Sequence, residues 1–174
     1  ILSLILWNYF NLNIKTNDSN KINIFFPLTF LILIFFQIIV GAFVSGMDAG
    51  LIYNSWPLMG NTYFPDDNKF LNLFNISVFN DASLVQFIHR NLAYLIVIFY
   101  VLIFMKIYKN KIKKSFFAIN CLGIILLIQI ILGILTLING VQIVLASMHQ
   151  ISSIFLVSAS IYFLFVNKDK KLSI

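Results

Sequence analysis

The sequence of 174 residues contains no glutamate, and it has only one arginine, one cysteine and two histidines. Any carboxylate that acts as an acid or a base must therefore be an aspartate. The lone cysteine, Cys121, excludes an internal disulfide bond. A protein zinc site normally uses three or four protein ligands, so the scarcity of histidine, cysteine and glutamate disfavours zinc.

Charged residues of any kind are also scarce, at 10%, whereas 60% of the residues are hydrophobic and the mean hydropathy is +0.94. A helix needs about 20 apolar residues to cross the hydrocarbon core of a bilayer. Four apolar runs reach that length, at residues 24–45, 84–105, 116–138 and 145–166. The sequence predicts an all-α, polytopic membrane protein built as a four-transmembrane-helix bundle.

The chain begins at Ile1 with an apolar stretch, ILSLILWNYF, that is too short to span a bilayer. It lacks the pattern of a secretory signal peptide. We expect residues 1–23 to hold the end of a preceding helix and an inner loop. Residues 24–166 are expected to form the membrane domain, with an outer loop at 46–83, and residues 167–174 a basic inner tail.

The net charge of +6 follows the expected topology rather than a nucleic-acid-binding surface. Ten lysines flank the spans at the ends that would share one face of the membrane: Lys15, Lys21, Lys106, Lys109, Lys111, Lys113, Lys114, Lys168, Lys170 and Lys171. The positive-inside rule puts that face toward the cytoplasm of a bacterial cell, or toward the matrix in a mitochondrial inner membrane. The expected partner is the lipid bilayer, and no nucleic acid is expected.

A short internal repeat joins the two halves of this bundle. The stretch QIIVG at 37–41 matches QIILG at 129–133, and each pentapeptide puts a glutamine and a glycine on one face of an outward-running helix. An inward-running helix with a histidine near its start follows each of them. The pattern indicates two helical hairpins related by a pseudo-twofold axis along the membrane normal.

His89 and His149 are the only histidines, and both fall inside predicted spans. At about 1.5 Å per residue they lie roughly 8 Å and 6 Å from the starts of two helices that run in the same direction. Similar depths just under the outer surface would let both rings point at one central object. Ionisable residues inside a membrane usually face a bundle interior and mark a functional site.

Two histidines on opposed helices suit the two axial positions of a heme iron, and a bundle core is a common place for heme. Two alternatives stay open. A thioether from Met47, Met59 or Met148 could replace one histidine, or both histidines could be structural residues bonded to serine, asparagine or backbone carbonyls.

Arg90, the only arginine, directly follows His89. A guanidinium forms paired hydrogen bonds with a carboxylate, so we predict that Arg90 binds a heme propionate. The alternative is that it reaches out to the lipid headgroups. Asp48, at the outer end of the first span, is the nearest candidate for a carboxylate base, although an aspartate in that position more often caps a turn.

Three stretches resemble the C-terminal half of heme A synthase: GAFVSGMDAGLIYNSWPLMGNTYFP at 41–65, QFIHRNLAYL at 86–95 and QIILGILTLINGVQIVLASMHQ at 129–150. The resemblance covers about residues 30–165. Members of that family are eight-helix membrane oxidoreductases made of two similar four-helix halves. They oxidise the C8 methyl group of heme O to the formyl group of heme A for cytochrome c oxidase.

The resemblance implies that His89 and His149 are the axial ligands of a heme b, with Arg90 beside them. It also implies that this chain is one half of an enzyme, whose full form takes heme O and releases heme A. The family's oxidising half carries a glutamate three residues before a histidine. The matching position here is Gln86, so catalytic residues cannot be assigned within this chain.

Two other functions stay open: a non-catalytic membrane cytochrome b that carries electrons, and a heme-free transporter or assembly protein. Two ligands at one depth disfavour a carrier, because electron transfer across a bilayer usually uses hemes at two depths. The resemblance implies heme O synthase and the cytochrome oxidase assembly pathway as partners, and it leaves a homo-oligomer open. The heme site is expected near the outer face of the membrane.

Overall fold

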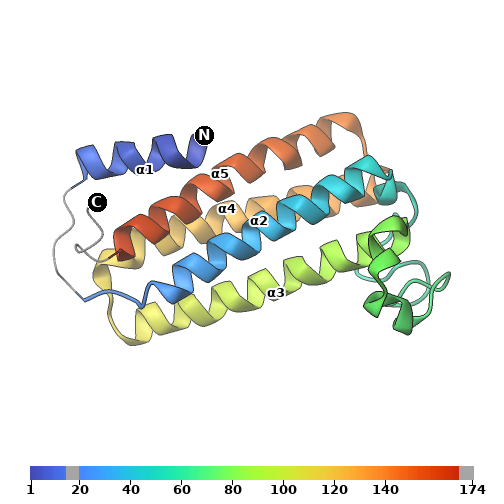
Figure 1. Cartoon of the computed structure of the whole chain (residues 1–174), viewed down its shortest axis with the longest axis horizontal. Coiled ribbons are helices and arrows are strands. Elements are labelled where there is room, and N and C mark those ends of the chain that lie inside the picture. Colours follow the sequence, from blue (N-terminus) through green and yellow to red (C-terminus); the bar gives the residue numbers. More distant parts are fainter. Residues whose placement is uncertain (15–19, 169–174) are drawn as a thin grey trace.

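The computed structural model describes residues 1–14 and 20–168, and the regular elements within them are helices. In chain order these are α1 (Leu2–Asn13), α2 (Phe25–Gly46), η1 (Ala49–Leu51), η2 (Phe70–Phe74), η3 (Ile76–Asn80), α3 (Ala82–Lys109), α4 (Lys113–Ile138) and α5 (Ile143–Asn167), where η marks a short 3-10 helix. Figure 1 shows α2 to α5 running along one axis, with the loop between α2 and α3 gathered at one end. We call that end outer and the end with the α3–α4 turn inner.

The predicted fold class is confirmed, because α2, α3, α4 and α5 are each long and apolar enough to cross a membrane. The protein is therefore an integral membrane protein. The largest difference from the predicted spans is at the inner end of α3, which continues to Lys109 instead of residue 105. Lys106 and Lys109 lie in its last turn, where positive charge interacts favourably with the helix dipole.

The first helix, α1, packs against α5, as Figure 1 shows. The ring of Trp7 meets Phe165 edge-on at 5.6 Å, and Phe10 meets Tyr162 at 5.3 Å between centroids. Three lysines that entered the topology prediction, at positions 15, 170 and 171, lie outside the described residues.

The order of the helices around the bundle follows from their contacts. Helix α2 packs against α3 and α5, and α4 packs against α5 and α3. Among the described residues, α3 and α5 make at most marginal contact with each other, as do α2 and α4. The helices therefore occupy four corners in the order α2, α3, α4, α5, and the two histidine-bearing helices face each other across a diagonal.

The tightly packed core lies toward the inner end. Buried residues of α4 run from Ser115 to Leu126, and those of α5 from Leu156 to Asn167. Phe30 of α2 and Ile103 of α3 join the same cluster. The outer halves of α4 and α5 contain no fully buried residue, so their inward-facing side chains are less closely packed than those at the inner end.

The connection between α2 and α3 folds back onto the outer ends of both helices. Phe64 packs on Phe87 of α3 with ring centroids 5.0 Å apart, and Phe79 packs on Phe43 of α2 at 5.5 Å. Val78, between these contacts, is buried. The loop is thus a packed part of the outer end.

Helix α3 begins at a capping aspartate, Asp81. Its Oδ1 accepts hydrogen bonds from the backbone N–H of Leu84 at 3.1 Å and from the hydroxyl of Ser83 at 2.8 Å. Its Oδ2 accepts one from Nδ2 of Asn68 at 3.0 Å. Burial by itself would raise the pKa of this carboxyl, but the hydrogen bonds outweigh it and hold the pKa below its ordinary value.

Acidification is therefore expected to destabilise the outer end of α3. Because the folded-state pKa of Asp81 is lower than the unfolded-state one, its stabilisation is complete above the unfolded value and is lost as the pH falls through the folded value. Asp81→Ala should remove about 0.5–2 kcal/mol at neutral pH, whereas Asp81→Asn keeps a capping oxygen and loses mainly the pH dependence. Thermal unfolding in detergent across the acid range measures both. If the unfolding temperature falls at acidic pH by the same amount in both variants as in the unsubstituted chain, this assignment is contradicted.

Candidate histidine site

The two histidines lie at matching depths near the outer end. His89 is seven residues into α3 from Ala82, and His149 is six residues into α5 from Ile143. At about 1.5 Å per residue these offsets differ by only ~1.5 Å along the helix axes. Both histidines are partly buried. The structure thus brings the two predicted site residues together at one level of the bundle.

Each histidine ring packs against a glycine of the outward-running helix that precedes it. A Cβ atom at Gly41 of α2 would lie 3.1 Å from Cε1 of His89. At Gly133 of α4 it would lie 2.9 Å from Cε1 of His149. An added Cβ atom at Gly133 would force the ring or the helix to shift, and at Gly41 the ring would have to move by a few tenths of an ångström. Close approach, rather than backbone conformation, therefore favours glycine at both positions. The repeated glycine of the sequence thus has a matching role in both hairpins.

The repeated glutamine has a matching role as well. In the first hairpin, Nε2 of Gln37 donates a hydrogen bond to the backbone carbonyl of His89 at 3.0 Å. The same nitrogen lies 3.3 Å from each nitrogen of the His89 ring. The other amide atom, Oε1, is buried and has no hydrogen-bond partner within the described part of the chain.

In the second hairpin, Nε2 of Gln129 donates to the backbone carbonyl of His149 at 3.0 Å. Here Oε1 of the glutamine is satisfied, because it accepts a hydrogen bond from the hydroxyl of Ser152. Nδ1 of the His149 ring lies 3.1 Å from the backbone carbonyl oxygen of Gln129. A carbonyl can only accept, so Nδ1 carries the proton in this contact and Nε2 of the neutral ring keeps its free lone pair.

Arg90 is bound by the outer loop. Its NH1 donates to the carbonyls of Ser55 at 3.0 Å and Leu58 at 3.2 Å, and its NH2 donates to the carbonyl of Tyr53 at 3.0 Å. Nε is buried and has no partner among the described residues. The guanidinium therefore holds a loop segment, a contact that the sequence did not indicate. Binding of a propionate by Arg90 stays a prediction.

Two further side chains of α3, those of Gln86 and Tyr94, form hydrogen bonds with the same loop. Nε2 of Gln86 donates to the carbonyl of Tyr53 at 3.0 Å, and Nε1 of Trp56 donates to the hydroxyl of Tyr94 at 3.0 Å. On the opposite side, Nδ2 of Asn54 donates to the carbonyl of Leu137 in α4 at 3.0 Å. The loop thus bridges α3 and α4 at the outer end, and its contacts with α3 run from Gln86 to Tyr94, on both sides of His89 along the helix.

Arg90→Lys is expected to loosen loop residues 53–58. A lysine ammonium cannot reproduce the planar fork of a guanidinium, so at least part of the three-carbonyl contact is lost. Hydrogen bonds from charged donors contribute about 1.5–3 kcal/mol each, so local amide hydrogen exchange should speed up by about tenfold or more. Mass spectrometry on the detergent-solubilised protein measures this, with Lys106→Arg at the inner end as the control. Unchanged exchange at 53–58 would mean that the loop is held by its other contacts.

The remaining candidates fall outside the histidine site. Asp48 is exposed and precedes η1, but its side chain makes no capping hydrogen bond, so the expected cap is absent. Met59 is buried within the loop, and Met148 is 49% exposed on the outer surface of α5. Met47 is half-buried at the end of α2. Within the described residues no hydrogen bond joins any of these four side chains to a histidine ring, and the thioether alternative gains no support.

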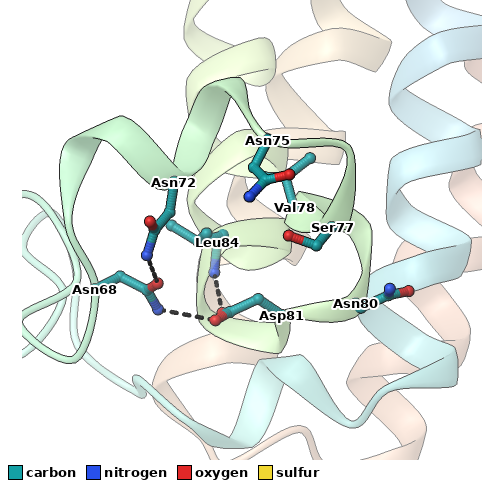
Figure 2. A pocket seen from close by; sticks show the side chains of 8 residues that line it. All are labelled: Asn68, Asn72, Asn75, Ser77, Val78, Asn80, Asp81 and Leu84. Carbon is teal, nitrogen blue, oxygen red and sulfur yellow. Dashed lines mark hydrogen bonds between the residues drawn. The ribbon is translucent and has the colours of Figure 1, made fainter.

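A polar pocket of about 320 Å³ lies in the outer loop and is shown in Figure 2. It is lined by Asn68, Asn72, Asn75, Ser77, Val78, Asn80, Asp81 and Leu84. Three of its polar side chains bond to one another, since Asn72 donates to Oδ1 of Asn68 at 3.1 Å and Asn68 donates to Oδ2 of Asp81 at 3.0 Å. Because Asp81 is already engaged in capping α3, we assign the pocket a role in loop structure.

The fold and the site define an integral membrane four-helix bundle with two histidines at one depth on diagonal helices. Within residues 1–14 and 20–168, no group of three or more histidine, cysteine, aspartate or glutamate residues could hold a metal ion by itself. The family model for COX15-CtaA, described as cytochrome oxidase assembly protein, matches residues 1–161. The chain belongs to this family.

Curated relatives agree with the family. The chain is 43% identical to heme A synthase of Pelagibacter ubique over 169 residues, which cover 97% of the chain and 49% of that protein. It is 40% identical to heme A synthase of Rickettsia felis, over 89% of the chain and 46% of that protein. Heme A synthase of Wolbachia pipientis is 38% identical over 94% of the chain and 46% of that protein. The chain thus spans about half the length of these relatives. No solved structure matches it.

Proposed function

We propose that this chain is the heme b-binding, C-terminal half of a heme A synthase, with His89 and His149 as the axial ligands of the iron. The observation that carries the proposal is the paired arrangement of the two rings on diagonal helices at one depth. Two imidazoles are what a six-coordinate heme iron requires from a protein, whereas zinc would need further ligands. The relatives described above, which are named heme A synthases, support the same proposal.

The surrounding residues fit such a group. The contact of His149 Nδ1 with the Gln129 carbonyl leaves Nε2 free for a metal, and a ligating histidine usually donates its other N–H in this way. Gly41 and Gly133 let the rings lie close to the outward-running helices. Between Leu126 of α4 and Leu156 of α5 neither helix contains a buried side chain, so the core is not closed at the level of His149.

A heme b at this site would supply one-electron redox chemistry. The chain's own residues would hold the iron and fix the orientations of the two histidine rings. The loop between α2 and α3 would cover the outer end. Gln86 supports an electron-transferring rather than an oxidising half, because it stands where the oxidising half carries a glutamate. It is an uncharged amide bonded to the Tyr53 carbonyl and cannot act as an acid or a base.

In the full protein we propose that the other half oxidises the C8 methyl group of heme O to the formyl group of heme A, for assembly of cytochrome c oxidase. Heme O synthase is then the source of the substrate. The division into a membrane domain at 24–166 and a basic inner tail at 167–174 belongs to the same proposal. So does the location, a bacterial or mitochondrial inner membrane with the heme near its outer face.

The first test is a reduced-minus-oxidised optical spectrum of the detergent-purified chain, with pyridine hemochrome identification of the heme. Sharp low-spin bands and a b-type hemochrome are expected. A folded helical preparation that binds no heme, even after addition of iron protoporphyrin IX, would refute the proposal for this chain. It would favour a heme-free transporter or assembly protein instead.

A further inference from the structure

The two hairpins differ at one position beside the histidines. The residue one helical turn after His149 is Ser152, whose hydroxyl donates to Oε1 of Gln129. The equivalent residue after His89 is Leu92, which packs against the hydrophobic core and has no hydroxyl to donate. The two glutamines therefore make the same bond through Nε2, but only one of them has its oxygen satisfied.

We infer that Gln37 and Gln129 are positioning residues for the two site histidines, and that they act unequally: Gln129 is locked by Ser152, whereas Gln37 keeps a free acceptor for the His89 ring. The inference rests on the proposed function, since it concerns how the ligands of the iron are held. Neither glutamine is a ligand, and both act through the imidazoles.

The geometry around Gln37 supports its role as a positioning residue for His89. Its Nε2 ties α2 to the backbone of His89 at 3.0 Å, which fixes the height of that residue against the outward-running helix. Gly41, one turn further along α2, leaves room for the edge of the ring. The amide and the glycine together restrict where the His89 imidazole can lie.

The unpaired Oε1 of Gln37 supports the inference that the two glutamines act unequally. A buried acceptor without a partner is unfavourable. Besides the backbone carbonyl of His89, both ring nitrogens of His89 lie near the Gln37 amide, each 3.3 Å from its Nε2. A modest rotation of ring or amide would let a ring N–H donate to Oε1. Such a bond makes the imidazole a stronger donor to the iron and stabilises the ferric state, which lowers the midpoint potential.

The test uses the full chain loaded with iron protoporphyrin IX and four variants: Gln37→Met, Leu92→Ser, the double variant, and Ser152→Ala. Heme content, midpoint potential and the g values of the ferric low-spin EPR signal are measured for each. Gln37→Met keeps the side-chain length but removes both polar atoms. Leu92→Ser supplies the hydroxyl that Ser152 supplies in the other hairpin, and so ties up Oε1 of Gln37.

Gln37→Met and Leu92→Ser are both expected to retain heme, raise the potential and change the g values. The double variant should show no further rise beyond Gln37→Met, because both changes act on the same oxygen. Ser152→Ala frees Oε1 of Gln129 but should leave the potential nearly unchanged, because the Nδ1 proton of His149 already donates to the backbone carbonyl of Gln129. These readouts separate a positioning role from a loss of stability.

Normal heme binding with an unchanged potential in every variant would overturn this inference alone. The inference would also be overturned if Leu92→Ser changed the midpoint potential equally in the unsubstituted chain and in the Gln37→Met variant. The serine would then act without the Gln37 amide. If Gln37→Met fails to fold, Leu92→Ser still decides the question, with Ser152→Ala as its control in the other hairpin, since neither removes an amide. An unsubstituted chain that takes up no heme would instead refute the proposed function on which the inference rests.

Discussion

The double variant His89→Ala/His149→Ala is expected to lose the low-spin heme spectrum completely. Both axial positions would be empty of protein ligands, and no other histidine exists in the chain. Each single variant leaves one ligand, and its heme should become high-spin and bind at least about 100-fold more weakly, since even outer partners of metal ligands contribute 10–100-fold. Optical spectra and heme titration of the purified variants measure both effects.

Cys121→Ser provides the matched control, because Cys121 lies in the inner half of α4, away from the histidines. Its heme spectrum should equal that of the unsubstituted chain. The histidine variants should also keep their helical content, because the packed core lies at the inner end. A full low-spin spectrum in the double alanine variant would show that the iron is held elsewhere.

Gly133→Ala is expected to impair heme binding more than Gly41→Ala. The added methyl group would lie 2.9 Å from Cε1 of His149 in the first case and 3.1 Å from Cε1 of His89 in the second. The shorter distance forces the ring or the helix to move, whereas the longer one needs a shift of a few tenths of an ångström. Overpacking of this kind costs about 1–3 kcal/mol, which corresponds to roughly 5–150-fold in affinity.

Gly46→Ala serves as the control, since nothing lies within 4 Å of a Cβ atom at that position and its heme affinity should not change. Gly123→Ala tests stability apart from the site, because its methyl group would overlap the hydroxyl of Tyr100 at 2.0 Å, far from the histidines. It should lower the unfolding temperature without changing the spectrum of the heme that remains bound. Equal affinities for Gly41→Ala and Gly133→Ala would mean that the rings do not rest on these glycines in the loaded protein.

The four spans could be predicted from the sequence because each is a run of apolar residues of membrane length with few charges inside it. The equal depth of His89 and His149 followed from the same runs, because a helix converts residue offset into distance at a fixed rise. The repeated glutamine and glycine were also visible, since their spacing puts both on one helix face. These features depend on local geometry alone, which a sequence specifies directly.

The contacts of Arg90 could not be predicted in this way. Its guanidinium binds the carbonyls of Tyr53, Ser55 and Leu58, which lie 32 to 37 residues earlier in an irregular loop. Backbone carbonyls carry no residue-specific signal, and the path of such a loop depends on packing at its two ends. Ser152 is different, because a serine one helical turn from a histidine is a pattern that the sequence displays, and its pairing with Gln129 was missed.

The uneven distribution of the core bears on the order of events during biogenesis. The interlocked side chains from Phe30, Ile103, Leu122 and Phe163 join all four spans at the inner end. The helices are thus held together at the inner end independently of the contacts at the histidine level. On the proposed function, we expect insertion into the bilayer and loading with heme to be separable steps, because the inner core does not depend on the histidine level.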